Sequence, residues 1–139
     1  MSSMRELRIE ADLANLVTVA EFVSVCCEQW RIDESNIHKI QLAIDEAVTN
    51  IIEHAYNGGD GEIVLRCWIA AHHFYVKLLD RGEGFEQEDV IQPNITGSLA
   101  ERDVGGLGLY FMRQLMDEVH FESHEGVNTL QMVKHSVAP

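Results

Sequence analysis

Two β-rich runs separated by only three residues restrict the fold of this chain more than any other feature of its sequence. Residues 62–70 and 74–79 are rich in aliphatic, aromatic and β-branched side chains, and they are joined by Ala71, His72 and His73. A parallel pair of strands needs a crossover of about a dozen residues or more, so these two strands are expected to pair as an antiparallel hairpin. The fold must therefore contain antiparallel sheet.

Apolar spacing and turn residues predict the other elements of the N-terminal half. Residues 6–10 alternate polar and apolar side chains, which indicates an edge strand. Asp12 is placed to cap a helix that extends to about Trp30. Asp33, Glu34 and Ser35 are the turn and cap candidates before a second helix, which includes residues 41–56 and ends where Asn57-Gly-Gly-Asp-Gly61 interrupts it.

In the C-terminal half, residues 86–104 have little periodicity and predict a loop or partly helical lid. A third helix is expected over residues 109–118. Strands at 119–123 and 129–134 then close the chain around a turn at Glu125-Gly126.

The order of these elements is strand, helix, helix, hairpin, lid, helix, hairpin. It predicts an α/β (α+β) two-layer sandwich, in which a mixed, mostly antiparallel sheet carries three helices on one face. A doubly wound nucleotide fold would alternate helix and strand throughout, which this chain does not. With 139 residues, residues 1–139 are expected to form a single domain.

Composition excludes several classes of function. Ten Lys and Arg residues against 23 Asp and Glu give a formal charge of −13, so direct nucleic-acid binding is not expected and protein partners are favoured. No apolar run reaches the roughly 18 residues of a membrane span, and the N-terminus lacks the apolar core of a signal peptide. A cytoplasmic protein is expected. Cys26, Cys27 and Cys67 fit buried structural thiols in a reducing compartment.

A polar stripe follows the helix predicted for residues 41–56. Glu46, Asn50 and His54 are four residues apart, and each step of four advances only about 40° around a helix. A carboxylate can accept a proton, and an amide oxygen is a ligand suited to Mg²⁺. The stripe is either a site or an ordinary solvated helix face.

Two glycine segments have a similar ambiguity. Asp80-Arg-Gly-Glu-Gly-Phe85 follows a strand, where its carboxylate is able to accept a hydrogen bond from the amine of a base or simply to end the strand. Gly105-Gly-Leu-Gly-Leu109 opens a helix, where backbone N–H groups favour a phosphate, although a plain helix-start turn also fits. Neither the P-loop nor the complete dinucleotide pattern is present.

Together and in this order, these motifs resemble the GHKL ATPase superfamily, which includes gyrase, MutL and the histidine-kinase catalytic domains. The segments that carry a closer resemblance, to the bacterial anti-sigma-factor serine kinases, are Glu46-Ala-Val-Thr-Asn50, His54-Ala-Tyr56, the Asp80–Phe85 box and Gly106-Leu-Gly-Leu109 leading to Leu115-Met-Asp-Glu118. The resemblance covers nearly the whole chain.

The resemblance implies a role for each matched residue. Glu46 is the expected general base, Asn50 the ligand of the Mg²⁺ that bridges the ATP phosphates, and Asp80 the acceptor of the adenine amine. The other nucleotide-contacting positions that it implies are Gly82 and Gly84 at the base, Gly105, Gly106, Leu107, Gly108 and Leu109 around the phosphates beneath the lid, and Thr129 near the adenine. His54 is expected to be a packing residue.

The function that the resemblance implies is that of an ATP- and Mg²⁺-dependent protein serine/threonine kinase. Such a kinase phosphorylates an anti-sigma-factor antagonist and sequesters a sigma factor, and a homodimer is expected. Two alternatives stay open: a nucleotide-responsive binding module that transfers no phosphate, and a structural domain that binds no nucleotide.

Overall fold

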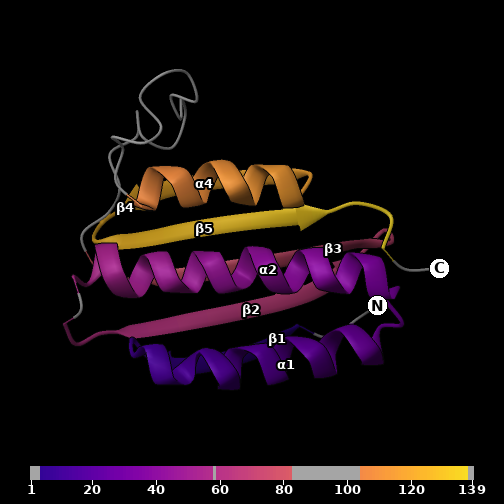
Figure 1. Cartoon of the computed structure of the whole chain (residues 1–139), viewed down its shortest axis with the longest axis horizontal. Coiled ribbons are helices and arrows are strands. Elements are labelled where there is room, and N and C mark those ends of the chain that lie inside the picture. The colour runs from indigo at the N-terminus through magenta and orange to yellow at the C-terminus, as the bar shows by residue number, and fades with distance from the viewer. Residues whose placement is uncertain (1–3, 58, 83–103, 138–139) are drawn as a thin grey trace.

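The computed structural model describes residues 4–57, 59–82 and 104–137, which form one sheet and a layer of helices (Figure 1). The sheet has five strands in the order β1-β2-β3-β5-β4. Their bounds are β1 Arg5–Glu10, β2 Glu62–Ala70, β3 His73–Asp80, β4 Glu118–His124 and β5 Val127–Lys134. All four pairings are antiparallel, so the described strands form a purely antiparallel sheet rather than a mixed one.

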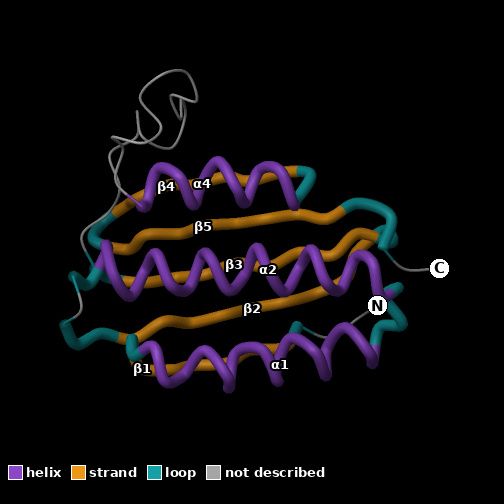
Figure 2. Tube along the Cα trace, in the orientation of Figure 1, coloured by secondary structure: helices purple, strands orange, loops and turns teal. Residues whose placement is uncertain are grey.

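The helices lie side by side over one face of this sheet (Figure 2). Their bounds are α1 Leu16–Gln29, α2 Glu34–Asn50 and α4 Val104–Leu115, with a 3-10 turn, η1, at Leu13–Asn15 and a π-helical segment, η2, at Ile51–Ala55. Helix α2 packs between α1 and α4. The predicted two-layer sandwich, with its hairpins and its edge strand β1, is confirmed. No helix among the described residues is long and apolar enough to cross a bilayer.

Side-chain caps fix the start of the 3-10 turn η1, which leads into α1, and the start of α2. Asp12 Oδ1 accepts a hydrogen bond from the Ala14 N–H at 2.9 Å, and Asp33 Oδ2 accepts one from the Asn36 N–H at 3.2 Å. Each bond satisfies an N–H group that has no partner within its helix, which is typically worth about 1 kcal/mol. The cap predicted at Asp12 is confirmed, and Asp33 lies in the stretch expected to start the second helix.

The core lies between the sheet and the helices. Strand β3 alternates strictly, burying Phe74, Val76 and Leu78 on the helix side. Ile40 and Ile44 of α2 meet this face in the same apolar cluster. Burying side chains of this size contributes about 1.5–3 kcal/mol each, so α2 is anchored along most of its length.

The three cysteines are buried and unpaired, as expected of structural thiols. Burial raises the pKa of Cys27 to about 12 and that of Cys67 well above its ordinary value. Neither thiol forms a thiolate near neutral pH, so both behave as small apolar groups.

The third helix differs from its predicted bounds of 109–118. It begins at Val104, so the glycine segment is helical rather than a turn before the helix. It ends at Leu115, because the Asp117 N–H donates to the Val133 carbonyl at 2.9 Å and draws the chain into the sheet. The loop or lid predicted over residues 86–104 lies outside the described residues except for its last position.

Candidate active site

The polar side chains predicted on the second helix occupy the C-terminal end of α2. Glu46 and Asn50 are both within the regular α-helix, so the predicted spacing of about 40° between them holds. Glu46 is half-buried, whereas Asn50 is 1% exposed. In Figure 1 this end of α2, the end of β3 and the start of α4 lie at the same end of the molecule.

The Asn50 amide is buried without a hydrogen-bond partner. Neither its Oδ1 nor its Nδ2 has a partner among the described residues. Leaving a buried polar group unpaired costs about 1–3 kcal/mol, so such a group in a native protein calls for an explanation, of which a bound ion is one. Amide oxygens are hard ligands that Mg²⁺ accepts, so the position fits a metal or a polar ligand.

His54 does not continue the stripe as a regular α-helix would place it. The helix changes at Ile51 to the wider π form, in which Tyr56 N–H bonds to the Ile51 carbonyl five residues earlier. Single π turns occur often at functional sites. The buried Nε2 atom of His54 also has no partner within the described part of the chain, so this end of the helix presents three unpaired polar atoms.

Glu46 has an environment that favours its neutral form. Burial raises the pKa of its carboxyl group, and the negative charges of Asp45 and Glu53 raise it further. A carboxylate whose pKa is shifted toward neutrality is a better proton acceptor than an exposed one, because it binds the proton more strongly. Glu46 is therefore chemically suited to act as a general base.

Asp80 ends strand β3 and is 6% exposed. Its Oδ1 accepts hydrogen bonds from Gly82 N–H at 2.9 Å and from Asn128 Nδ2 at 2.8 Å. Burial raises the pKa of this carboxyl group, while the bonds from Asn128 and Gly82 act in the opposite direction. Because both bonds fall on Oδ1, Oδ2 is left to accept a further bond from a ligand.

Sequence reasoning missed Asn128, and the structure does not bring Thr129 to this cluster. In the β3–β5 register Asp80 pairs with Asn128, whereas Thr129 pairs with Leu79 and lies on the helix-free face. Asn128 is 3% exposed, and its Nδ2 also donates to the Gly82 carbonyl at 2.9 Å. Its position after a turn gives no signal in the sequence, because only the strand register places it beside Asp80.

The glycine positions are only partly described. A side chain at Gly82 would bring its Cβ to 2.3 Å from the Ala55 carbonyl oxygen, so only glycine allows this approach to the end of the π segment. Leu109 is fully buried in the core. The remaining positions are Gly105, Gly106, Leu107 and Gly108, whose backbone lies in the first turns of α4, and Gly84, which is outside the described residues.

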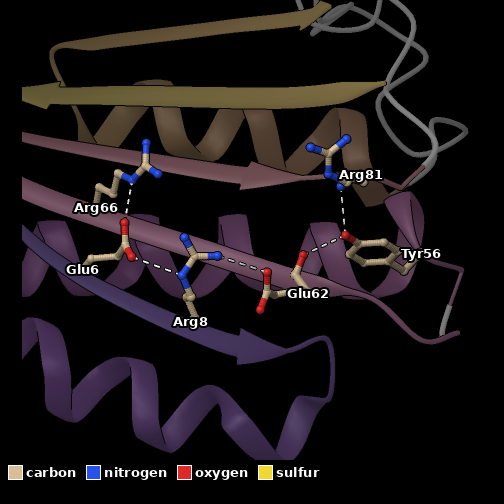
Figure 3. A network of polar contacts seen from close by, with 6 residues as sticks. All are labelled: Glu6, Arg8, Tyr56, Glu62, Arg66 and Arg81. Carbon is tan, nitrogen blue, oxygen red and sulfur yellow. Dashed lines mark hydrogen bonds and ion pairs between the residues drawn. The ribbon is translucent and has the colours of Figure 1, made fainter. Parts of the chain in front are cut away.

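A cavity of about 490 Å³ opens on the helix-free face of the sheet. Tyr56 and Asp80 line it, but Glu46 and Asn50 do not. Three arginines, Arg8, Arg66 and Arg81, also line it, and so do three acidic residues, Asp60, Glu62 and Asp80. A further carboxylate, Glu6, pairs with Arg8 and Arg66 at 3.1 and 2.8 Å (Figure 3). No surplus of positive charge is therefore available there for phosphates, and the candidate site lies on the helix side.

The antiparallel sheet, the helices on one face and the buried Asn50 and Asp80 at one end define a two-layer ATPase-type domain. Residues 9–134 match the family model of the histidine kinase-like ATPase domain, and the chain belongs to this family.

Its relatives include the serine-protein kinase RsbW of Bacillus velezensis, 31% identical over 94% of this chain and 84% of that protein. The anti-sigma F factor of Caldanaerobacter subterraneus is 33% identical over 96% and 94% of the two chains. The crystal structure of the RsbU and RsbW domains of a Mycobacterium tuberculosis protein shares the fold, with a TM-score of 0.69 at 20% identity. That match covers 95% of this chain and 31% of the other.

Proposed function

We propose that this protein is an ATP-dependent protein serine/threonine kinase that phosphorylates an anti-sigma-factor antagonist and sequesters a sigma factor. The observation that carries the proposal is the buried amide of Asn50, which has no partner in the described part of the chain and lies one helical turn from the half-buried Glu46. A fold alone does not specify a reaction, whereas this pair supplies a metal ligand and a base. The names of the relatives agree with a kinase that acts on sigma-factor regulation.

In the proposed complex, Asp80 binds the exocyclic amine of adenine through Oδ2, and Asn128 holds the carboxylate in place through Oδ1. Asn128 thus replaces Thr129 as the proposed residue beside the base. Gly82 allows the strand end to approach the helix closely. Gly84 remains a proposed contact of the base.

The triphosphate would lie at the N-terminal end of α4, whose dipole and free N–H groups favour negative charge. Gly105 and Gly106 lie in the first turn of α4, whose N–H groups have no partner within the helix, and Leu107, Gly108 and Leu109 follow in the same segment. Asn50 would hold Mg²⁺, which offsets phosphate charge when bound. A protein with a formal charge of −13 needs such compensation to bind ATP.

Glu46 would accept the proton of the substrate hydroxyl. As that oxygen bonds to the γ-phosphorus, the bond from phosphorus to the β–γ bridging oxygen breaks, and ADP leaves with the electron pair. The raised pKa of Glu46 strengthens its hold on the proton during this step. Positioning and charge neutralisation supply the rest of the catalysis.

The test uses purified protein, γ-labelled ATP and the candidate antagonist. Wild type should transfer label, and Glu46→Gln should lower the rate by roughly 10²–10⁴-fold while ATP binding persists. Glu21→Gln is the matched control, since Glu21 is exposed on α1 and does not contribute to the raised pKa of Glu46. Label transfer unaffected by Glu46→Gln would remove the proposed role of Glu46.

A wild-type protein that binds ATP and transfers no label would instead be a nucleotide-responsive binding module. If calorimetry detects binding of neither ATP nor ADP, the nucleotide site itself is refuted. We also propose a cytoplasmic homodimer, in line with the resemblance and with the buried free cysteines. Sedimentation equilibrium that returns the 15.7 kDa monomer mass would contradict the dimer.

A further inference from the structure

Tyr56 follows the π segment directly and connects two other parts of the chain through its hydroxyl group. The hydroxyl donates a hydrogen bond to the Glu62 carbonyl at 2.7 Å and accepts one from the Arg81 N–H at 2.8 Å (Figure 3). The first bond reaches the start of β2, and the second reaches the residue after Asp80. One side chain thus links the end of the site helix to both strands of the hairpin.

The hydroxyl occupies the place where the β2–β3 ladder would otherwise continue. The last pair in the register is Val64 with Leu79, and two further residues along each strand place Glu62 opposite Arg81. In a continued ladder the Arg81 N–H and the Glu62 carbonyl would be expected to bond to each other. Here the Tyr56 hydroxyl stands between them, so it ends the ladder and satisfies both groups.

The ring of Tyr56 is held by close contacts that require glycine. A Cβ at Gly61 would lie 2.2 Å from Cε1 of the ring, and a Cβ at Gly82 would lie 3.0 Å from Cδ1. The backbone of Tyr56 is also fixed, because its carbonyl accepts a hydrogen bond from Gly59 N–H at 2.7 Å. These contacts therefore restrict the Tyr56 hydroxyl to one position.

The segment from Asp80 to Gly82 depends on two consecutive hydrogen bonds. Arg81 N–H is held by the Tyr56 hydroxyl, and Gly82 N–H is held by Asp80 Oδ1. The backbone directly after Asp80 is thus held, through the Arg81 N–H, by the residue that follows α2 and its π segment. A shift of the Arg81 amide would move the carboxylate relative to that helix.

We propose that Tyr56 is a positioning residue for the nucleotide site, fixing the Asp80 carboxylate at the end of β3 relative to Asn50 on α2. The inference rests on the proposed function, because it takes Asp80 as the residue that selects adenine. Tyr56 itself need not touch the nucleotide. Its contribution is to keep the acceptor oxygen at the position where the amine of the base arrives.

The decisive variant is Tyr56→Phe, which keeps the ring and removes only the hydroxyl. The Arg81 amide should then exchange with deuterium at least roughly tenfold faster in NMR experiments, because it loses its acceptor. Calorimetry should give roughly 3–10-fold weaker ADP binding. Inosine diphosphate, which lacks the amine, should bind with nearly unchanged affinity. The ratio of ADP affinity to inosine diphosphate affinity should therefore fall, and a loss of stability alone would not change this ratio.

Tyr75→Phe is the matched control, since the Tyr75 ring stacks on Trp68 in the middle of the hairpin, 5.2 Å between centroids. It should change neither the rate of deuterium exchange at the Arg81 amide nor the ratio of ADP affinity to inosine diphosphate affinity. If Tyr56→Phe does not fold, Gly61→Ala provides the second test, because it keeps the hydroxyl but displaces the ring and should lower the same ratio.

The role of Tyr56 would be overturned if Tyr56→Phe left the deuterium exchange of the Arg81 amide unchanged. It would also be overturned if this variant bound ADP as wild type does, with the same ratio of ADP to inosine diphosphate affinity. Either result would leave the proposed function standing. Absence of ADP binding by wild type would overturn the proposed function and this inference with it.

Discussion

Replacing Asp80 with asparagine exchanges one oxygen for an amino group at a site where the orientation of the side chain is already fixed. Asn128 Nδ2 and Gly82 N–H both donate to Oδ1, at 2.8 and 2.9 Å. The oxygen of the new amide must remain there to accept them. Its NH₂ group therefore takes the place of Oδ2 and presents a donor to the amine of adenine, which is itself a donor.

The expected loss follows from that replacement. A hydrogen bond to a charged group is worth about 1.5–3 kcal/mol net, and each 1.4 kcal/mol is about tenfold in affinity. ADP should therefore bind to Asp80→Asn about 10–150-fold more weakly than to wild type. Inosine diphosphate presents an acceptor oxygen in place of the amine, so its affinity should rise relative to that of ADP.

Asp80→Asn should bind ADP less well, but its stability relative to wild type should increase as pH rises. Burial raises the pKa of Asp80 above 3.8, so the folded protein binds this proton more tightly than the unfolded chain. Wild-type stability consequently falls as pH rises from 3.8 through the folded pKa, and the asparagine variant lacks this decline. The difference in Tm should therefore move in favour of the variant as pH rises above about 4.

Titration calorimetry with both nucleotides and thermal denaturation across pH measure these effects. Asp60→Asn is the control, because it makes the same change at an exposed position. Wild-type ADP affinity in Asp80→Asn, or an unchanged preference for ADP over inosine diphosphate, would refute the assignment of Asp80 to the base.

Three further predictions concern buried positions. Asn50→Leu removes two buried polar atoms that have no partner among residues 4–57, 59–82 and 104–137, so the free energy of unfolding in denaturant titrations should rise by about 1–3 kcal/mol. Mg²⁺-dependent ATP binding should be lost, and a lower free energy of unfolding would contradict this account. Gly82→Ala places a Cβ 2.3 Å from the Ala55 carbonyl oxygen, so it should lower the affinity for ADP and lower the free energy of unfolding by about 1–3 kcal/mol. Wild-type values of both would show that the backbone moves apart without cost. Cys27 and Cys67 should resist iodoacetamide at pH 8 until the protein unfolds, and rapid labelling of folded protein would argue against their burial.

Local features were predictable because their causes are local. The short connection predicted at 71–73, which is only Ala71 and His72 in the structure, forces the β2–β3 hairpin. Asp12 caps the helical stretch that begins at Leu13. The spacing of Glu46 and Asn50 depends only on the α-helical repeat, which holds through Asn50. These predictions required no knowledge of what packs against each element.

The end of the site helix was less predictable. Beyond Asn50 the chain adopts a π segment that no residue pattern in the sequence indicated, so the position expected for His54 does not follow from the regular repeat. The hydroxyl of Tyr56 then reaches Glu62 and Arg81, and it does so because Gly61 and Gly82 leave room for the ring. The contact with Arg81 joins segments that are 25 residues apart in sequence.

The sequence by itself determined the elements, their order and the residue types that can perform phosphoryl transfer. Only the tertiary structure decided which of Asn128 and Thr129 faces Asp80, since side chains alternate along a strand and a shift of one residue turns each to the opposite face. The pairing with β3 sets that register. Burial, likewise a property of the assembled layers, then leaves the Asn50 amide unpaired and raises the pKa values of Glu46 and Asp80.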